Sequence, residues 1–213
     1  MKFLQRGKQI YIGTINTSEI EIRDLLKAWV AISIAFAVVL SKFPNLRALD
    51  LSFYQVFIIA AVSVGTGFLL HELGHKLVAQ RYGCFAEFRS FDQMLILAIL
   101  MSFFGFVFAA PGAVMIQGPV GRKRNGMISA AGPIVNLVLA LFFIFILLIF
   151  PTGFLKVLAF YGFFINTWLA LFNMIPFGIF DGAKVLRWDK KVYGIIVAIA
   201  FGFLFLQNFI SIA

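Results

Sequence analysis

The sequence predicts an all-α polytopic membrane protein, and three observations lead to this class. Of the 213 residues, 62% are hydrophobic and only 13% are charged, whereas soluble domains average about 45–50% apolar and about 25% charged residues. Several stretches are long and apolar enough to span a bilayer. No stretch is polar and long enough for a separate soluble domain, so we expect a single membrane-embedded domain over residues 1–213.

The predicted elements follow one another along the chain with short connections. Alternating apolar and polar residues within 2–21 predict short N-terminal β elements, and Ser18 with Glu21 predicts a cap for the following helix. The five predicted full transmembrane helices are residues 25–43, 53–80, 127–150, 154–175 and 193–212. The predicted connections include polar or charged loops at residues 81–92, 121–126 and 181–191.

Residues 94–110 are apolar but only marginally long enough to cross, and the following residues 111–116 resemble a turn with a short β segment. If the segment crosses, lysine and arginine residues divide nine to nine between the two sides. If residues 94–116 enter and return on one side, the division is 15 to 3, as the positive-inside rule expects. We therefore predict a re-entrant or short sixth membrane helix followed by a membrane-associated β segment; six ordinary helices are the alternative.

The same charge distribution predicts the orientation and argues against one class of partner. It places the N-terminus in the cytoplasm and the C-terminus outside the cell membrane. The net charge of +9 does not indicate nucleic-acid binding, because lysine and arginine mostly mark cytoplasmic loops in membrane proteins. Residues 1–24 lack the apolar core of a signal peptide, so we expect the first membrane helix to direct insertion.

The two histidines of the chain both lie in the segment His71-Glu72-Leu73-Gly74-His75, at the end of an apolar run. Helical residues four apart share one face, about 6 Å apart along the axis, so both imidazoles can bind one metal ion. Glu72 is close enough to reach a metal-bound water. This is the H-E-x-x-H pattern of zinc hydrolases, with two nitrogen ligands and a general base. Three ionisable groups beside lipid are costly unless each has a partner or a task.

A catalytic zinc ion takes three protein ligands, so a carboxylate or Cys84 must supply the third. Asp181 is the best candidate, because it directly follows the fourth predicted membrane helix, although Asp-Gly is also a common turn dipeptide. Asn173 ends the same helix and could bind a ligand, a water molecule or a substrate backbone. Asn136 needs a hydrogen bond within the membrane, and a purely structural bond between helices is equally compatible with its position.

In these residues and their order, the chain resembles the site-2 proteases, which are zinc intramembrane metalloproteases. The matching segments are His71–His75, Ala130–Asn136, and Asn173–Pro176 continuing to Asp181-Gly182, within a core of residues 53–187. One departure is Ala183, where many relatives have a second glycine.

The resemblance implies hydrolysis of a peptide bond within or near a transmembrane segment of a membrane-protein substrate, in the lipid bilayer. It implies one zinc ion per chain, held by His71, His75 and Asp181, with Glu72 as the catalytic base. Asn173 and Asn136 would hold the substrate or the oxyanion, and residues 111–116 would pair with the substrate as a strand. A metal transporter or a scaffold is the rival class, but a transporter would need further acidic or histidine groups along its path.

Overall fold

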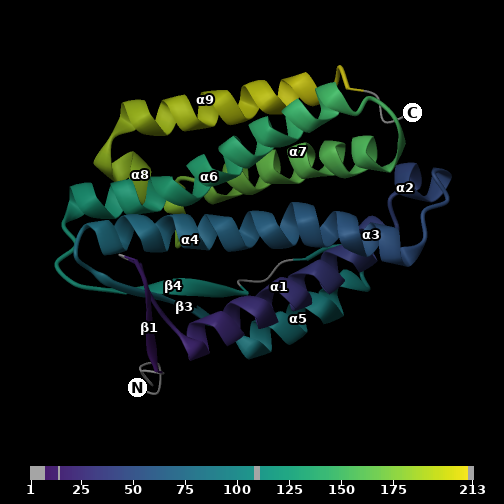
Figure 1. The fold of residues 1–213 in the computed structure, drawn as a ribbon. Coiled ribbons are helices and arrows are strands. Elements are labelled where there is room, and N and C mark those ends of the chain that lie inside the picture. Colours follow the sequence, from purple (N-terminus) through teal and green to yellow (C-terminus); the bar gives the residue numbers. More distant parts are fainter. Residues whose placement is uncertain (1–7, 14, 108–110, 211–213) are drawn as a thin grey trace.

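The computed structural model describes residues 8–13, 15–107 and 111–210. Helix α4 runs through the middle of the molecule, between the helices α6, α7 and α9 on one side and a small sheet with α1 and α5 on the other (Figure 1). The strands are β1 (Gln9–Ile12), β2 (Ile15–Ser18), β3 (Phe85–Ser90) and β4 (Gly112–Gln117). The helices are α1 (Glu19–Leu40), α2 (Pro44–Ala48), α3 (Phe53–Ala60), α4 (Thr66–Arg81), α5 (Asp92–Ser102), α6 (Arg122–Ile149), α7 (Gly153–Asn173), α8 (Asp181–Trp188) and α9 (Lys190–Gln207).

Among the described residues, four stretches are long and apolar enough to cross a membrane, which fits a membrane protein. They are Phe53–Arg81, Arg122–Ile149, Gly153–Asn173 and Lys190–Gln207, and they correspond to four of the five predicted crossings. The end of the last predicted crossing, residues 211–212, lies outside the described residues. Helix α1 is the remaining predicted crossing, and it is not among these four stretches. Its first turns carry too many charged residues: Glu19, Glu21, Arg23, Asp24 and Lys27.

Helices α3 and α4 form one continuous stretch through a single π-helical turn, Ala61–Gly65. Ser52 begins it with a capping box, in which its side chain accepts from the Gln55 backbone N–H. The π turn changes the hydrogen-bond pattern, and the Ser63 carbonyl accepts a bond from Asn166 of α7 at 3.3 Å. The turn therefore links the helix that carries both histidines to its neighbour.

The prediction of a polar loop at residues 81–92 is wrong for its central part, because residues 85–90 form strand β3. Glu87 and Arg89 alternate with Ala86 and Phe88, which is the period-two pattern of a strand. Strand β3 pairs antiparallel with β4, from Phe85 opposite Gln117 to Ser90 opposite Gly112. The predicted β segment after residue 110 is thereby confirmed.

Helix α5 is too short to cross a bilayer alone. Its 11 residues span about 16 Å, against roughly 30 Å of hydrocarbon. The chain leaves the sheet after Ser90 and rejoins it at Gly112, and the Phe91 N–H donates to the Pro111 carbonyl at 3.0 Å. The chain therefore leaves and rejoins the sheet at the same end, and re-entry into the membrane stays a prediction; residues 108–110 of that segment lie outside the described residues.

Two other predicted loops are helical. Residues 122–126 form the first turns of α6, and Pro133 lies inside that helix. Residues 181–188 form α8, with Asp181 as its first residue. The packing of these two helices against each other explains why both segments are helical. A Cβ added at Gly126 would lie 2.2 Å from the Cβ of Trp188, so the start of α6 and the end of α8 are in close contact.

The predicted N-terminal β elements are confirmed for the described residues as the antiparallel hairpin β1–β2. The Ser18 side chain accepts from the Glu21 backbone N–H at 3.2 Å, so the predicted cap is also present. The Gln80 side chain of α4 bonds the Asn16 backbone and the Ala86 carbonyl. The hairpin is thereby held against α4 and the β3–β4 sheet.

Candidate metal centre

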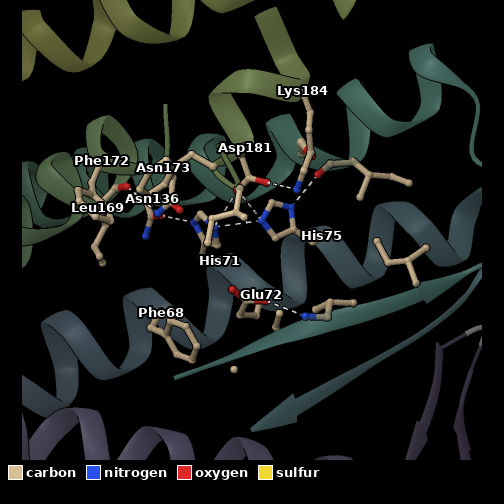
Figure 2. Close-up of a pocket in the computed structure, with 18 of the residues that line it drawn as sticks. Phe68, His71, Glu72, His75, Asn136, Leu169, Phe172, Asn173, Asp181 and Lys184 are labelled. Atoms are coloured by element: carbon tan, nitrogen blue, oxygen red, sulfur yellow. Dashed lines mark hydrogen bonds and ion pairs between the residues drawn. The ribbon is translucent and has the colours of Figure 1, made fainter. Parts of the chain in front are cut away.

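A cavity of about 300 Å³ lies between α4, α6, the end of α7, the start of α8 and strand β4. Its lining includes His71, Glu72 and His75 from α4, together with Asn136 and Asp181 (Figure 2). The sequence pattern placed the three α4 residues together. The fold adds Asp181 from a segment more than one hundred positions later in the chain.

His71, His75 and Asp181 bring three donor atoms to one point. The two Nε2 atoms are 3.0 Å apart, and Asp181 Oδ2 lies 3.3 Å from that of His71 and 3.0 Å from that of His75. Tetrahedral zinc with bonds of about 2.0–2.2 Å has ligand atoms roughly 3.3–3.6 Å apart. All three residues are buried. The donor set therefore fits a zinc ion, and the observed spacings of 3.0–3.3 Å lie at or slightly below this range.

The second nitrogen of each ring has an acceptor that fixes its tautomer. His71 Nδ1 lies 2.6 Å from Asn136 Oδ1, and His75 Nδ1 lies 2.7 Å from the carbonyl oxygen of Ile128. With the proton on Nδ1, each Nε2 keeps a lone pair directed at the convergence point. This is the protonation state that a metal ligand needs.

Asp181 reaches the histidines because the chain turns back sharply after α7. A Cβ added at Gly182 would lie 2.2 Å from the Met174 carbonyl oxygen, so only glycine permits this return. Burial alone would raise the pKa of the Asp181 carboxyl, but hydrogen bonds and charge from the protonated forms of His71 and His75 outweigh it and hold the pKa below its usual range. The ionised carboxylate is the form that binds a metal, and a bound cation would take the place of the two Nε2 protons.

Gly132 of α6 forms the floor under both imidazoles. A Cβ added there would lie 2.5 Å from the Nε2 atom of His71 and 2.5 Å from that of His75. Any larger residue would push both rings away from Asp181. The space at this position is therefore part of the metal centre, and it explains why a glycine precedes Pro133.

Glu72 lies beside the centre and points to strand β4 instead of toward the imidazoles (Figure 2). Its Oε2 atom accepts the Val114 backbone N–H at 3.1 Å. The side chain belongs to the lining of the same cavity and is nearly buried. A carboxylate at this place can reach a water molecule in the cavity.

The comparisons with known proteins agree with this geometry. No family profile and no solved structure matches the chain. The archaeal protein named "Putative zinc metalloprotease MJ0611" of Methanocaldococcus jannaschii is 40% identical over 195 residues, which cover 90% of this chain and 96% of the relative. The chain belongs to this zinc metalloprotease family.

A second relative extends the same relationship. "Zinc metalloprotease MJ0392" of the same organism is 28% identical over 141 residues, which cover 65% of this chain and 35% of that relative. The chain thus matches about a third of the longer protein. The protein is a zinc-dependent protease, and His71, His75 and Asp181 are the group of described residues that could hold the metal.

The remaining predicted site residues occupy two different places. In this zinc metalloprotease Asn173 lines the cavity, and its side-chain Nδ2 donates to the Leu169 carbonyl one turn back, at 2.9 Å. Asn136 is completely buried behind His71 and donates from Nδ2 to the Gly67 carbonyl and to Asn166 Oδ1. Asn136 therefore makes the inter-helix bonds that the sequence left open. Cys84, the alternative third ligand, packs beside Ala79 instead.

Sequence reasoning missed two polar residues of the site. Asn166 is fully buried in α7, where its Oδ1 accepts from Asn136 Nδ2 and its own Nδ2 donates to the carbonyls of Ser63 and Gly162. An amide within an apolar helix was the signal that could have found it. Lys184, one turn after Asp181, lines the cavity and places its Nζ 3.4 Å from Asp181 Oδ1; as one charge in a basic segment, it had no distinguishing signal.

Proposed function

We propose that this zinc metalloprotease cleaves a peptide bond within or near a transmembrane segment of a membrane-protein substrate, as site-2 proteases do. One observation carries the proposal: the three donor atoms and Glu72 lie on or against Phe53–Arg81, a stretch apolar enough to cross a membrane. His71 is about 27 Å along the helix from Phe53, which puts the site toward one end of that stretch.

The residues divide the chemistry among them. His71, His75 and Asp181 hold one zinc ion, which when bound supplies a Lewis acid that acidifies water and stabilises developing negative charge. Glu72 takes a proton from the attacking water and returns it to the leaving amine. Asn136 orients His71 through the Nδ1 contact.

Substrate recognition follows from the position of β4. Gly112, Val114 and Ile116 all line the cavity, and the Val114 N–H points away from β3. A helical substrate must unwind before its carbonyl can be attacked, and pairing with this strand edge replaces the hydrogen bonds that unwinding breaks. Asn173, on the opposite wall of the cavity, is placed to bind the substrate backbone or the oxyanion. The substrate is thus held between β4 and α7.

The membrane arrangement is the second part of the proposal. Five crossings, with α5 and β4 entering and leaving on the cytoplasmic side, put 15 of the 18 lysine and arginine residues on that side. The N-terminus is then cytoplasmic and the C-terminus lies outside the cell membrane. The metal centre lies in the cytoplasmic third of the bilayer, where water can reach it.

Cleavage of a single-span substrate in lipid vesicles tests the proposal. The wild-type protease should cut within or next to the apolar segment, as read by product mass. Glu72→Gln should retain zinc and cleave about 10²- to 10⁴-fold more slowly, because it cannot accept the proton. Glu19→Gln, on the exposed start of α1, is the matched control. Equal rates for wild type and Glu72→Gln, or cleavage only in distant polar regions, would contradict the proposal.

A further inference from the structure

The backbone N–H groups on the two outer edges of the β3–β4 sheet have different partners. On the β4 edge, the Val114 N–H meets Glu72 beside the metal centre. On the β3 edge, the Phe88 N–H donates to Glu21 Oε1 at 2.9 Å and the Ser90 N–H donates to Asp24 Oδ2 at 3.3 Å. Helix α1 therefore covers the β3 edge with two carboxylates, one turn apart, and leaves the β4 edge facing the cavity.

These bonds meet at one position of the sheet. Phe88 and Val114 are direct partners in the antiparallel register. Both of their N–H groups go to glutamate side chains, as expected at a pair whose backbone groups point away from the partner strand. A line of contacts thus runs from Glu21 through Phe88 and Val114 to Glu72, across the full width of the sheet.

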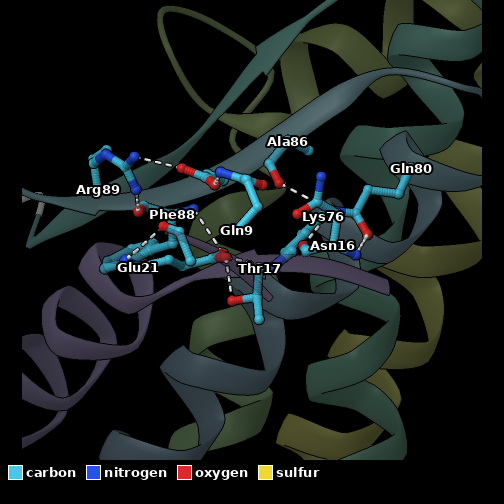
Figure 3. Close-up of polar contacts among 11 residues, drawn as sticks. Gln9, Asn16, Thr17, Glu21, Lys76, Gln80, Ala86, Phe88 and Arg89 are labelled. Atoms are coloured by element: carbon cyan, nitrogen blue, oxygen red, sulfur yellow. Dashed lines mark hydrogen bonds and ion pairs between the residues drawn. The ribbon is translucent and has the colours of Figure 1, made fainter. Parts of the chain in front are cut away.

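Helix α4 holds both ends of this line. Glu72 takes the β4 end directly, and Lys76, one turn later, places its Nζ 2.5 Å from Glu21 Oε2 (Figure 3). Glu21 and Lys76 are 0% and 2% exposed, so this ion pair is fully buried. Thr17 also donates to Glu21 Oε2, at 2.7 Å. We call Glu21, Asp24 and Lys76 the sheet clamp.

The Phe88 side chain adds a third attachment of the sheet to α4. Its ring meets that of Phe68 edge to face, with centroids 5.9 Å apart, and Phe88 itself is fully buried. Phe68 also lines the catalytic cavity. The sheet is therefore fixed to the same helix that carries both histidines, at three places within about three helical turns.

We propose that Glu21 is a positioning residue for the substrate: by accepting the Phe88 N–H, opposite Val114, it holds the open edge of β4 against Glu72, and with Asp24 it closes the β3 edge. This inference rests on the proposed function. When a substrate carbonyl accepts the Val114 N–H, Glu72 loses that hydrogen bond. Its carboxylate is then free to accept a proton from the attacking water. The sheet clamp then keeps β4 in place. Strand addition is restricted to the edge that faces the metal centre.

A matched pair of double variants tests this inference. Glu21→Gln with Lys76→Met removes both buried charges but keeps an oxygen acceptor for the Phe88 N–H. Glu21→Leu with Lys76→Met removes both charges and the acceptor. Doubles are needed because deleting one partner leaves the other charge buried and unpaired. Cleavage rates are expressed per bound zinc ion, so that loss of folded protein does not lower the measured rate. Cleavage positions in a single-span substrate are read by the mass of the products.

The Gln–Met variant should cleave at the wild-type position with a similar kcat/KM. The Leu–Met variant should show kcat/KM lower by about 10- to 100-fold and additional cleavage positions, because a small displacement of β4 misaligns the scissile bond. A role in stability alone would change neither quantity per bound zinc. Wild-type kcat/KM and cleavage position in the Leu–Met variant would overturn the inference, and so would equal defects in both doubles.

A second variant covers the case in which the Leu–Met protein does not fold. Glu21→Asp keeps the charge for Lys76 but is one methylene shorter, so it cannot hold both Lys76 and Phe88 without moving the sheet. It should lower kcat/KM and spread the cleavage positions, whereas Thr17→Val, which removes one other bond of Glu21, should leave both unchanged. Unchanged cleavage by Glu21→Asp would overturn the inference. If the wild-type protease cleaves no membrane substrate, the proposed function itself fails.

Discussion

Two buried polar clusters lie on opposite sides of α4, and two neighbouring residues of that helix each belong to one of them. His75 belongs to the metal centre, while Lys76 belongs to the sheet clamp. In the clamp, a cation meets an anion at 2.5 Å and the remaining carboxylate oxygen accepts a backbone N–H. In the metal centre, two imidazole nitrogens and a carboxylate oxygen converge.

The difference shows how to separate a self-sufficient cluster from one that binds something. In the sheet clamp, Lys76 balances the charge of Glu21, Asp24 pairs with Lys27, and the Phe88 and Ser90 N–H groups meet carboxylate acceptors. The metal centre directs lone pairs from Nε2 of His71, Nε2 of His75 and Oδ2 of Asp181 at one another, an arrangement that a cation satisfies. We therefore expect changes in the metal centre to alter zinc content, and changes in the clamp to alter stability and substrate alignment.

Among changes outside the three ligands, replacing Gly132 by alanine should have the largest effect on zinc. The new Cβ would lie 2.5 Å from the Nε2 atoms of both histidines, so the rings must move. We expect zinc affinity to fall by more than about 100-fold, beyond the usual effect of changes outside the ligands themselves. Competition with a chelator measures this affinity. Gly194→Ala, where no atom lies within 4 Å of the added Cβ, is the control. Normal zinc affinity in Gly132→Ala would be incompatible with the centre described.

Lys76→Met separates the two clusters most sharply. It leaves the Glu21 carboxylate buried without its cation, which should cost about 3–5 kcal/mol of unfolding free energy. Zinc content per folded chain should stay unchanged, because Lys76 touches no ligand. Denaturant unfolding in detergent and metal analysis check the two parts. Adding Glu21→Gln should restore most of the stability; a loss of zinc with no loss of stability would reverse the assignment of the clusters.

Asn136→Ala should weaken zinc binding without removing a ligand. The His71 Nδ1–H loses its acceptor at 2.6 Å, and Asn166 loses a partner as well. Changes to a group that orients a metal-bound histidine typically cost about 10- to 100-fold in affinity or activity. Chelator competition measures the effect. Unaltered affinity and activity would mean that the ring is held by its other contacts.

Asn173→Ala should have the smallest effect, and on the substrate alone. Its side-chain Nδ2 donates to the Leu169 carbonyl of its own helix, and Asn173 is not one of the three ligands. Loss of one hydrogen bond to a substrate costs about 0.5–1.5 kcal/mol, which corresponds to roughly 2- to 13-fold in kcat/KM. Steady-state cleavage kinetics with metal analysis test this. A drop in zinc content with unchanged kinetics per zinc would place Asn173 with Asn136 instead.

The metal centre was largely predictable from the sequence because its parts are local or follow directly from topology. His71 and His75 share one helical face, and Asp181 follows a predicted membrane helix closely. The four apolar helices were visible from hydropathy, and the β4 segment from the break in the apolar run. Gly132 lies within the Ala130–Asn136 segment that resembles the site-2 proteases, but its place under both imidazoles could not be predicted, because it depends on how α6 packs against α4.

The sheet clamp was not predictable, for a physical reason. Glu21 and Lys76 are 55 positions apart, and each alone resembles an ordinary charge near a membrane surface. Their pairing depends on β3, which sequence reasoning assigned to a loop because Glu87 and Arg89 made the segment look polar. Glu87 is buried in the structure because α1 and α4 pack against β3. Tertiary packing therefore decided both the strand and the ion pair.

Zinc stoichiometry in an isosteric pair of variants tests the central claim most directly. The account predicts one zinc ion per chain in the wild-type protease and in Asp189→Asn, which changes an aspartate at the start of α9. It predicts little or no zinc in Asp181→Asn, because a neutral amide replaces the carboxylate that completes the three-ligand set. If Asp181→Asn bound one zinc ion per chain with wild-type affinity, Asp181 would not be the third ligand and the account of the metal centre would be wrong.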